Sequence, residues 1–241
     1  MRHVRYQEIA DELRTRVRSA APGSLLPSEA ELSREFSASR VTIRRALEVV
    51  REDGLIAARQ GFGWFVSTEP VRQSLERLGT IESQLETSGR DPARRVIDFS
   101  FESPPVHVRK LLGPAKVLRV KRVSLADGEP FAVVTVWCPA VMGQRLSLDD
   151  VERRPFSELL DVELRGATQT IGADSADADL AGLLAVPVGA PLLKCQRVTA
   201  DLDGNPVLVS EHYFPAHRTE FVVDLPHDEP SITPAGLRLV E

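Results

Sequence analysis

The chain has 241 residues, 42% of them hydrophobic, and a formal net charge of −5. No stretch approaches the roughly 18 consecutive apolar residues that a membrane-spanning helix needs, so we expect no membrane partner and a cytoplasmic protein. Cys138 and Cys195 are too few for a disulfide framework and lack the spacing of a metal site, so we predict neither a metal nor another cofactor.

The charge is unevenly divided along the chain. Residues 1–70 hold 11 basic and 10 acidic side chains, a net charge of +1, and the remaining residues carry a net charge of −6. The acidic total therefore does not exclude DNA as a partner, because the second part of the chain sets it. Neither part is strongly basic, so DNA binding would depend on a few well-placed arginines and on two copies of the binding domain.

An amphipathic helix is predicted close to the N-terminus. Tyr6, Ile9, Leu13 and Val17 recur every three or four residues, which is the spacing of one face of a helix. Pro22-Gly23 ends this pattern. The helix must bury its apolar face against the segments that follow.

A helix-turn-helix is predicted next. Ser28 and Glu31 have the spacing of a capping box, in which the hydroxyl and the carboxylate satisfy each other's backbone N–H groups at a helix start. Residues 37–39 are small and polar, as a tight turn requires. A longer helix then begins at Arg40, with apolar positions at helical spacing, and Gly54 stands where a left-handed C-cap is expected.

The first turns of this longer helix carry the side chains that suit DNA. An arginine can grip a phosphate, or the O6 and N7 atoms of guanine, with both prongs of its guanidinium group, as recognition helices do in the major groove. The residues that we predict to contact DNA from this helix are Ser39, Arg40, Thr42, Arg44 and Arg45.

A β-wing is predicted after Gly54. Residues 55–59 and 64–66 have the composition of two short strands, and residues 60–63 join them. The glycines allow the hairpin tip to approach a DNA backbone or minor groove closely. We therefore predict Gln60 and Gly61 as further DNA contacts.

The N-terminal segment resembles a known family. Leu26-Pro27-Ser28-Glu29, the run Ser39-Arg40-Val41-Thr42-Ile43-Arg44-Arg45-Ala46-Leu47, Gly54-Leu55 and Gly61-Phe62-Gly63 resemble the DNA-binding domain of GntR-type bacterial transcription regulators over about residues 3–68. Trp64 departs from that pattern, because the family usually has threonine after the second wing glycine. The resemblance implies a winged helix-turn-helix, mainly helical with a β-wing.

The remainder of the chain is predicted to be an α+β domain. We divide the chain into a DNA-binding domain (1–70), a linker that has the pattern of a short helix (71–78) and a second domain (79–241). Asp127-Gly128 and Asp203-Gly204 mark two hairpin turns. Predicted strands at 95–101, 116–126, 131–138, 192–201 and 206–215, with helices at 78–88, 156–164 and 176–184, favour an antiparallel sheet with helices.

The second domain also resembles a known one. The segments 126–130, 155–160, 203–206 and 213–218, together with Arg122 and Arg197, are similar to the UTRA effector-binding domain of the HutC branch of the GntR regulators, over about residues 72–225. The resemblance implies a fold related to chorismate lyase, dimerisation through this domain, and binding of a small, often anionic metabolite.

The candidate effector-binding residues follow from that resemblance. Arg122 occupies the first of two positions where phosphosugar-binding members have arginine, whereas Ser124 occupies the second, which argues against a strongly charged phosphosugar. Ser157 is predicted at a helix N-terminus, which favours anions. The predicted lining residues are Arg122, Ser124, Thr135, Ser157, Glu211 and Tyr213.

Together these patterns predict a transcription regulator, and we expect a repressor. It would bind a palindromic operator as a homodimer and leave when a small, anionic effector binds. Two alternatives stay open: a constitutive architectural DNA-binding protein without a ligand, and a lyase-like enzyme. The sequence shows no nucleophile–base pair, metal cluster or glycine-rich phosphate loop, so we predict no enzyme.

Overall fold

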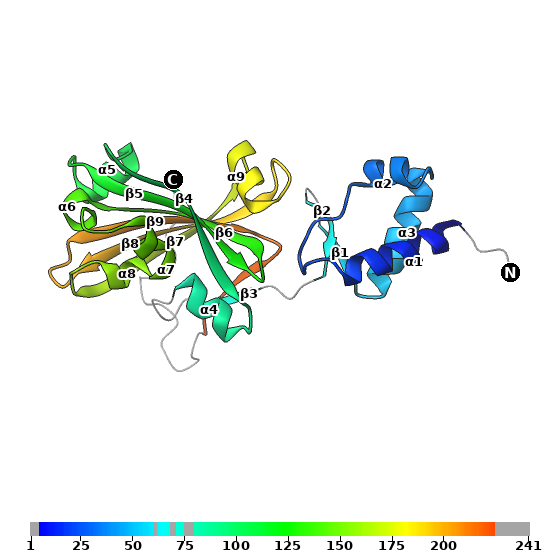
Figure 1. Cartoon of the computed structure of the whole chain (residues 1–241), viewed down its shortest axis with the longest axis horizontal. Coiled ribbons are helices and arrows are strands. Elements are labelled where there is room, and N and C mark those ends of the chain that lie inside the picture. Colours follow the sequence, from blue (N-terminus) through cyan, green and yellow to red (C-terminus); the bar gives the residue numbers. More distant parts are fainter. Residues whose placement is uncertain (1–4, 60–61, 68–70, 75–79, 225–241) are drawn as a thin grey trace, which may run out of the picture.

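The computed structural model describes residues 5–59, 62–67, 71–74 and 80–224. A small helical part lies at one end of the molecule and a part built on a large sheet at the other (Figure 1). None of the helices in these ranges is long and apolar enough to cross a membrane.

The small part is a three-helix unit with a wing, as predicted. Its elements are α1 (Arg5–Arg18), α2 (Glu29–Glu35), α3 (Arg40–Glu52), β1 (Ile56–Arg59) and β2 (Gly63–Val66). The apolar stripe of α1 is buried against the other two helices, since Ile9, Leu13, Leu32, Ile43 and Leu47 all have at most 1% of their surface exposed. Packing of three short amphipathic helices therefore forms this core.

Local signals in the sequence set the ends of these helices. Ser28 and Glu31 form the predicted capping box: Glu31 N–H donates to Ser28 Oγ, and Ser28 N–H donates to Glu31 Oε2 at 2.8 Å. Gly54 follows α3 with φ of +75°, a conformation that glycine adopts without strain.

The large part contains an antiparallel sheet of six strands, which confirms the predicted α+β class. Its order is β4-β5-β6-β9-β8-β7. The predicted hairpin turns at Asp127-Gly128 and Asp203-Gly204 join β5 to β6 and β8 to β9. In spatial order the strands are β4 (Pro92–Glu102), β5 (Val117–Ala126), β6 (Glu129–Pro139), β9 (Pro206–Pro215), β8 (Pro191–Asp201) and β7 (Leu164–Ser175).

Helices cover both faces of this sheet (Figure 1). On one face lie α4 (Ile81–Thr87), α7 (Leu148–Arg153) and α8 (Phe156–Leu159), and on the other lie α5 (Val106–Leu112) and α9 (Ala178–Leu184). The short α6 (Ala140–Gly143) packs against β5 and β6. The first face holds the largest apolar cluster, which includes Leu85, Val134, Phe156 and Phe214.

Local features of the second part differ from the sequence analysis. The helix predicted over 71–78 is wrong for its first half, because β3 (Val71–Ser74) pairs in parallel with β10 (Thr219–Val222). The helix predicted over 156–164 is the single turn α8, which is followed by β7. The sequence analysis missed β7 because it is mostly exposed and polar and contains two glycines, so it lacks the alternation of a half-buried strand.

Candidate DNA interface and effector pocket

The N-terminal end of α3 presents an exposed, cationic surface. Arg40, Arg44 and Arg45 are exposed, while the opposite stripe of the helix is buried in the core. Ser39 is the N-cap residue, and its Oγ accepts a hydrogen bond from Thr42 N–H at 3.2 Å. Its hydroxyl also lies 2.8 Å from Thr42 Oγ1. The cap therefore fixes the start of the helix from which the arginines project.

The three arginines differ in their surroundings. Arg44 reaches Glu29 of α2 with two prongs, at 3.0 and 2.7 Å, which lowers the pKa of Glu29. Arg45 lies over the ring of Tyr6, 4.6 Å from its centroid. Arg40 has no recorded ion pair or hydrogen bond with the residues that the structure describes. Arg40 can therefore meet DNA without breaking an existing ion pair, whereas Arg44 must exchange its carboxylate partner.

The structure describes the two strands of the wing and part of its tip. Gln60 and Gly61 lie outside the described residues, so their predicted DNA contacts stay predictions. The next residue, Phe62, is only 3% exposed and packs against the sheet-containing part of the chain. In this arrangement at least part of the wing tip is covered.

One residue of this surface escaped the sequence analysis. Val41 is 79% exposed and lies between the arginines on the first turn of α3. An apolar side chain there suits contact with the methyl group of thymine in the major groove. Its exposure could have been predicted, because Val41 lies outside the apolar stripe that α3 buries.

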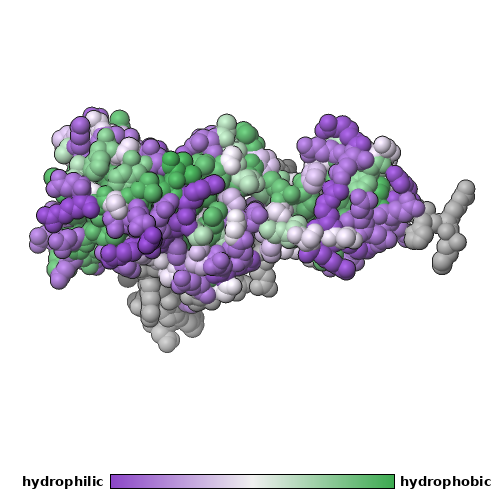
Figure 2. Space-filling view, viewed as in Figure 1, coloured by the Kyte–Doolittle hydropathy of each residue, from purple (hydrophilic) through white to green (hydrophobic). Residues whose placement is uncertain are grey.

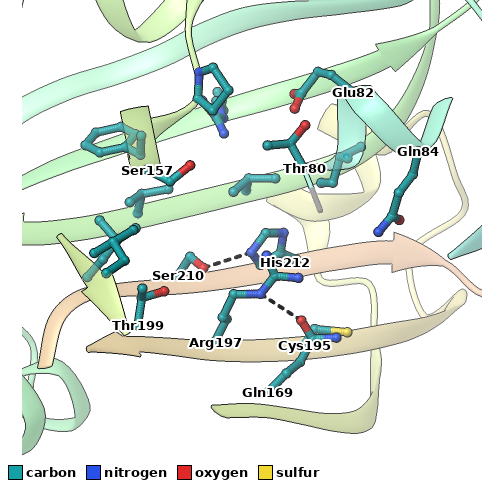
Figure 3. A pocket seen from close by; sticks show the side chains of 18 of the residues that line it. Thr80, Glu82, Gln84, Ser157, Gln169, Cys195, Arg197, Thr199, Ser210 and His212 are labelled. Atoms are coloured by element: carbon teal, nitrogen blue, oxygen red, sulfur yellow. Dashed lines mark hydrogen bonds between the residues drawn. The ribbon is translucent and has the colours of Figure 1, made fainter. Parts of the chain in front are cut away.

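A cavity of about 330 Å³ lies between the sheet and the helices on its α4 side. Figure 3 shows Thr80, Glu82 and Ser157 across the cavity from Arg197, Thr199, Ser210 and His212 of strands β8 and β9. Its lining combines apolar walls with convergent polar groups, as small-molecule sites do. The polar and ionisable lining residues are Thr80, Glu82, Gln84, Arg122, Ser157, Arg165, Gln169, Cys195, Arg197, Thr199, Ser210 and His212.

Arg122 places a buried cation in this cavity. It projects from β5 and is 7% exposed, and burial lowers its pKa to about 10, so it keeps its charge at neutral pH. Its Nη1 donates to Val151 O at 3.4 Å, whereas its Nε has no hydrogen-bond partner among the described residues. A buried donor without an acceptor is costly, and an anionic ligand would satisfy it.

Glu82 of α4 faces the same cavity and is engaged by another arginine. Burial alone would raise the pKa of Glu82, but the hydrogen bond and charge of Arg94 outweigh burial, and its pKa lies below the ordinary value. Glu82 therefore forms its ion pair with Arg94, while its charge also favours the charged form of Arg122.

An arginine and a histidine of two other strands line the cavity on the same face of the sheet as Arg122. Arg197 comes from β8, and its Nε donates to Gln169 Oε1 at 2.9 Å. His212 comes from β9 and lies 2.8 Å from Ser210 Oγ. Burial, with the charges of Arg197 and Arg122, lowers the pKa of His212 to about 3, so its ring is neutral at physiological pH. The cavity therefore joins the guanidinium groups of Arg122 and Arg197 to one neutral imidazole, and the exposed Arg165 adds a third guanidinium to its lining.

Comparisons with known proteins match each part of the chain to a known domain family. A model of the bacterial regulatory proteins of the gntR family matches residues 5–66, and a model of the UTRA domain matches residues 87–220. The chain belongs to the GntR family. It is a DNA-binding transcriptional regulator with a UTRA domain, as the resemblance implied.

Individual relatives are similar to this chain along most of its length. The regulator is 31% identical over 227 residues to the HTH-type transcriptional regulator Rv0792c of Mycobacterium tuberculosis, covering 91% of this chain and 83% of the relative. It is 26% identical to the HTH-type transcriptional repressor NagR of Bacillus subtilis, covering 90% and 93%. The crystal structure of PhnF from Mycobacterium smegmatis shares the fold with a TM-score of 0.62 and 24% identity, covering 91% and 100%.

The structure separates the six candidate effector residues of this regulator. Arg122 and Ser157 line the cavity. Ser124 is fully buried and does not line it. Because strand side chains alternate and Ser210, His212 and Phe214 face the cavity, Glu211 and Tyr213 face the other side of the sheet. Thr135, the partner of Glu211 in the ladder, faces that side too.

The opposite-facing residues have other contacts. Glu211 lies 3.4 Å from His107 of α5 and 3.8 Å from Lys194, and Lys194 lies over the ring of Tyr213. These residues belong to a charged network beneath α5, so we remove Thr135, Glu211 and Tyr213, along with Ser124, from the proposed effector site. The sequence analysis placed them by the family pattern without the strand register.

Several polar cavity residues were not among the predicted effector contacts, including Gln84, Arg197 and His212. The sequence analysis named Arg197 only as part of a family motif. The alternation of Ser210, His212 and Phe214 along one strand could have indicated that these three side chains share a face of the sheet. Among the described residues, no group of three or more histidine, cysteine or acidic side chains could hold a metal ion. Burial raises the pKa of the Cys195 thiol in the cavity wall to about 12, so it is protonated at neutral pH.

Proposed function

We propose that this regulator is a repressor that binds a palindromic operator as a homodimer and leaves it when a small anionic metabolite occupies the cavity. The observation that carries the proposal is Arg122: a buried guanidinium with an unpartnered Nε faces a cavity large enough for a small ligand. Ser157 and Arg197 add a hydroxyl and a second cation to the same cavity. We propose this set, with Gln84 and His212, as the effector site.

The contribution of Ser157 differs from the one first expected. Helix α8 has only one turn, so its dipole and free N–H groups contribute little anion binding. The side-chain hydroxyl of Ser157 supports the proposal instead, because Ser157 lines the cavity (Figure 3), as Arg122 does. The two arginines on different strands take the place of the pair that the family pattern has on one strand.

The position of the cavity supports a link to the DNA-binding part. Thr80, Ile81, Glu82 and Gln84, at the start of α4, form one wall of the cavity. The chain reaches α4 from β2 by way of β3, which pairs with β10. A ligand that moves α4 would therefore also displace the segment that connects α4 to the winged helix. We propose residues 1–70 as the DNA-binding unit, and we count β3 with the effector unit rather than with the linker.

The edge of the sheet supports a homodimer. β7 lies at the end of the strand order, and its outer side pairs with no strand among those described. Charged side chains and prolines keep free sheet edges from pairing with other strands. Residues 166–173 of β7 contain neither. We propose that β7 pairs with β7 of a second copy, which would hold two winged helices at a fixed spacing and raise operator affinity through effective concentration.

Charges placed on this edge are expected to separate the dimer. Thr168 and Thr170 are exposed, and in a symmetric pairing the introduced lysines of Thr168→Lys with Thr170→Lys would lie close to those of the second copy. We expect the wild type to sediment as a dimer at micromolar concentration and this variant as a monomer. Val141→Lys with Val188→Lys, at positions 73% and 70% exposed elsewhere, is the control and should stay dimeric. A monomeric wild type, or a dimeric edge variant, would refute the assignment.

The proposed function is tested with the whole chain. An operator is selected from random DNA duplexes with the purified protein, and its release is followed by fluorescence anisotropy against a panel of anionic metabolites. We expect a palindromic operator and release by at least one anion at a concentration that leaves the protein folded. Binding that no metabolite alters, without any ligand-induced thermal shift, would favour the architectural alternative. The cytoplasm, where operator DNA is found in bacteria, is the proposed location.

A further inference from the structure

The wing and the effector domain share one apolar cluster. Phe62 and Phe65 of the wing belong to the same contiguous set of buried side chains as Val133, Leu184 and Leu192 of the effector domain. Apolar surface continues across the junction of the two parts in the view of Figure 2. The two parts are therefore packed together and are joined by more than their linker.

His217 is the centre of this contact. Its ring lies 3.7 Å from the ring of Phe62 and 4.8 Å from the ring of Phe65, measured between centroids, and only 4% of His217 is exposed. Burial, with the charge of Arg218, lowers its pKa to about 3, so the ring is neutral and packs against the two phenyl rings as an aromatic group.

Arg218 adds hydrogen bonds that bridge the two parts. Its Nη2 donates to Gly23 O, on the loop between α1 and α2, and its Nη1 donates to Pro130 O of the effector domain at 2.9 Å. Its Nε donates to His217 Nε2 at 3.0 Å, which fixes the ring against the wing. The buried guanidinium of Arg218 thus connects the loop at Gly23, the sheet at Pro130 and the ring of His217.

The position of these two residues connects them to the effector cavity. His217 and Arg218 lie in the turn between β9 and β10. Phe214, just before this turn, and Phe221, just after it, both line the cavity, and their rings meet edge to face at 5.7 Å. A ligand that contacts these phenyl rings would alter the turn between them.

We propose that the contact of Phe62 with His217, together with the bond from Arg218 to Gly23, is an autoinhibitory latch that withholds the wing from DNA. In the latched state Phe62 and Phe65 are buried against the effector domain, so these two side chains of the wing are withheld from a DNA groove. The latch opens for operator binding, and a ligand that fits the closed arrangement of Phe214 and Phe221 favours the latched, released state. This control by the cavity rests on the proposed function.

A double-mutant cycle tests the latch with the full chain. Phe62→Ala removes the wing side of the contact, and His217→Ala removes the effector side, which is in the other part of the chain. We expect each variant to bind the selected operator about 3–10-fold more tightly than the wild type. We expect the double variant to gain no more than either single variant, because both remove one shared contact. Arg154→Ala, an exposed arginine of the effector domain, is the control and should not change affinity.

Small-angle X-ray scattering without DNA gives an independent measurement. Each latch variant should have a larger radius of gyration than the wild type, while circular dichroism should show that it is folded. Unchanged or weaker operator binding by folded variants, additive effects in the double variant, or an unchanged radius of gyration would overturn the latch. If the wild type selects no operator, the proposed function fails instead, and the scattering measurement still decides whether the latch exists.

Discussion

Replacing Arg122 with alanine is expected to leave operator binding intact and to abolish release by the effector. The side chain is remote from α3, and its removal leaves Glu82 with its partner Arg94, so no buried carboxylate loses its ion pair. An anionic ligand would lose its charge partner in a buried site, which costs about 2 kcal/mol or more, a loss of at least about thirty-fold in affinity.

The measurement is anisotropy of labelled operator titrated with the releasing metabolite, with wild type and variant side by side. Arg119→Ala is a matched control, because Arg119 lies on the same strand three residues away, at a position that alternation turns to the opposite face, where it pairs with Asp98 at 2.8 Å. Arg119→Ala should release normally. A neutral or cationic inducer, or normal release of Arg122→Ala, would remove Arg122 from the effector site.

Replacing Arg40 with alanine is expected to weaken operator binding by about 1–3 kcal/mol, or about 5–150-fold. Arg40 is exposed at the start of α3 and can reach DNA without breaking an ion pair among the described residues. Arg44→Ala should cost less, because Arg44 must first leave its two-pronged contact with Glu29. The order of the two effects is thus a consequence of the tertiary structure.

Gel-shift titration at several salt concentrations measures this effect and its origin. Loss of a phosphate contact should reduce the slope of log affinity against log salt by about 1, whereas loss of a base contact should relax sequence preference. Arg51→Ala is the control, since Arg51 lies in the last turn of the same helix. Unchanged affinity of a folded Arg40→Ala protein would show that this end of α3 does not contact DNA.

Much of the winged helix could be predicted because its signals are local. The capping box of Ser28 and Glu31, the glycine after α3 and the spacing of Ile43 and Leu47 each act within a few residues. Short amphipathic helices bury their single apolar stripe, so the sequence also predicted which face of α3 is exposed. What could not be predicted was the engagement of Arg44 by Glu29, because the two residues lie on different helices.

The effector site could be predicted only in part, because a sheet brings distant strands together. Arg122 was predicted from its strand, but whether Glu211 or His212 faces the cavity depends on the register of β9 against β6 and β8. A shift of one residue would exchange the two faces. The family pattern, applied without that register, therefore included Thr135, Glu211 and Tyr213, which lie on the face of the sheet opposite the cavity.

The sequence by itself determined the two folding units, the helix ends of the winged helix, the hairpin turns and the arginines of α3, since each depends on backbone preferences and periodicity over a few residues. Tertiary structure decided the rest. It joined Arg122, Arg197 and His212 from three strands around one cavity, and it brought Arg218 to Gly23 across 195 positions of the chain. Contacts of this kind leave no periodic signal, because they are selected by the packing of whole units and not by neighbouring residues.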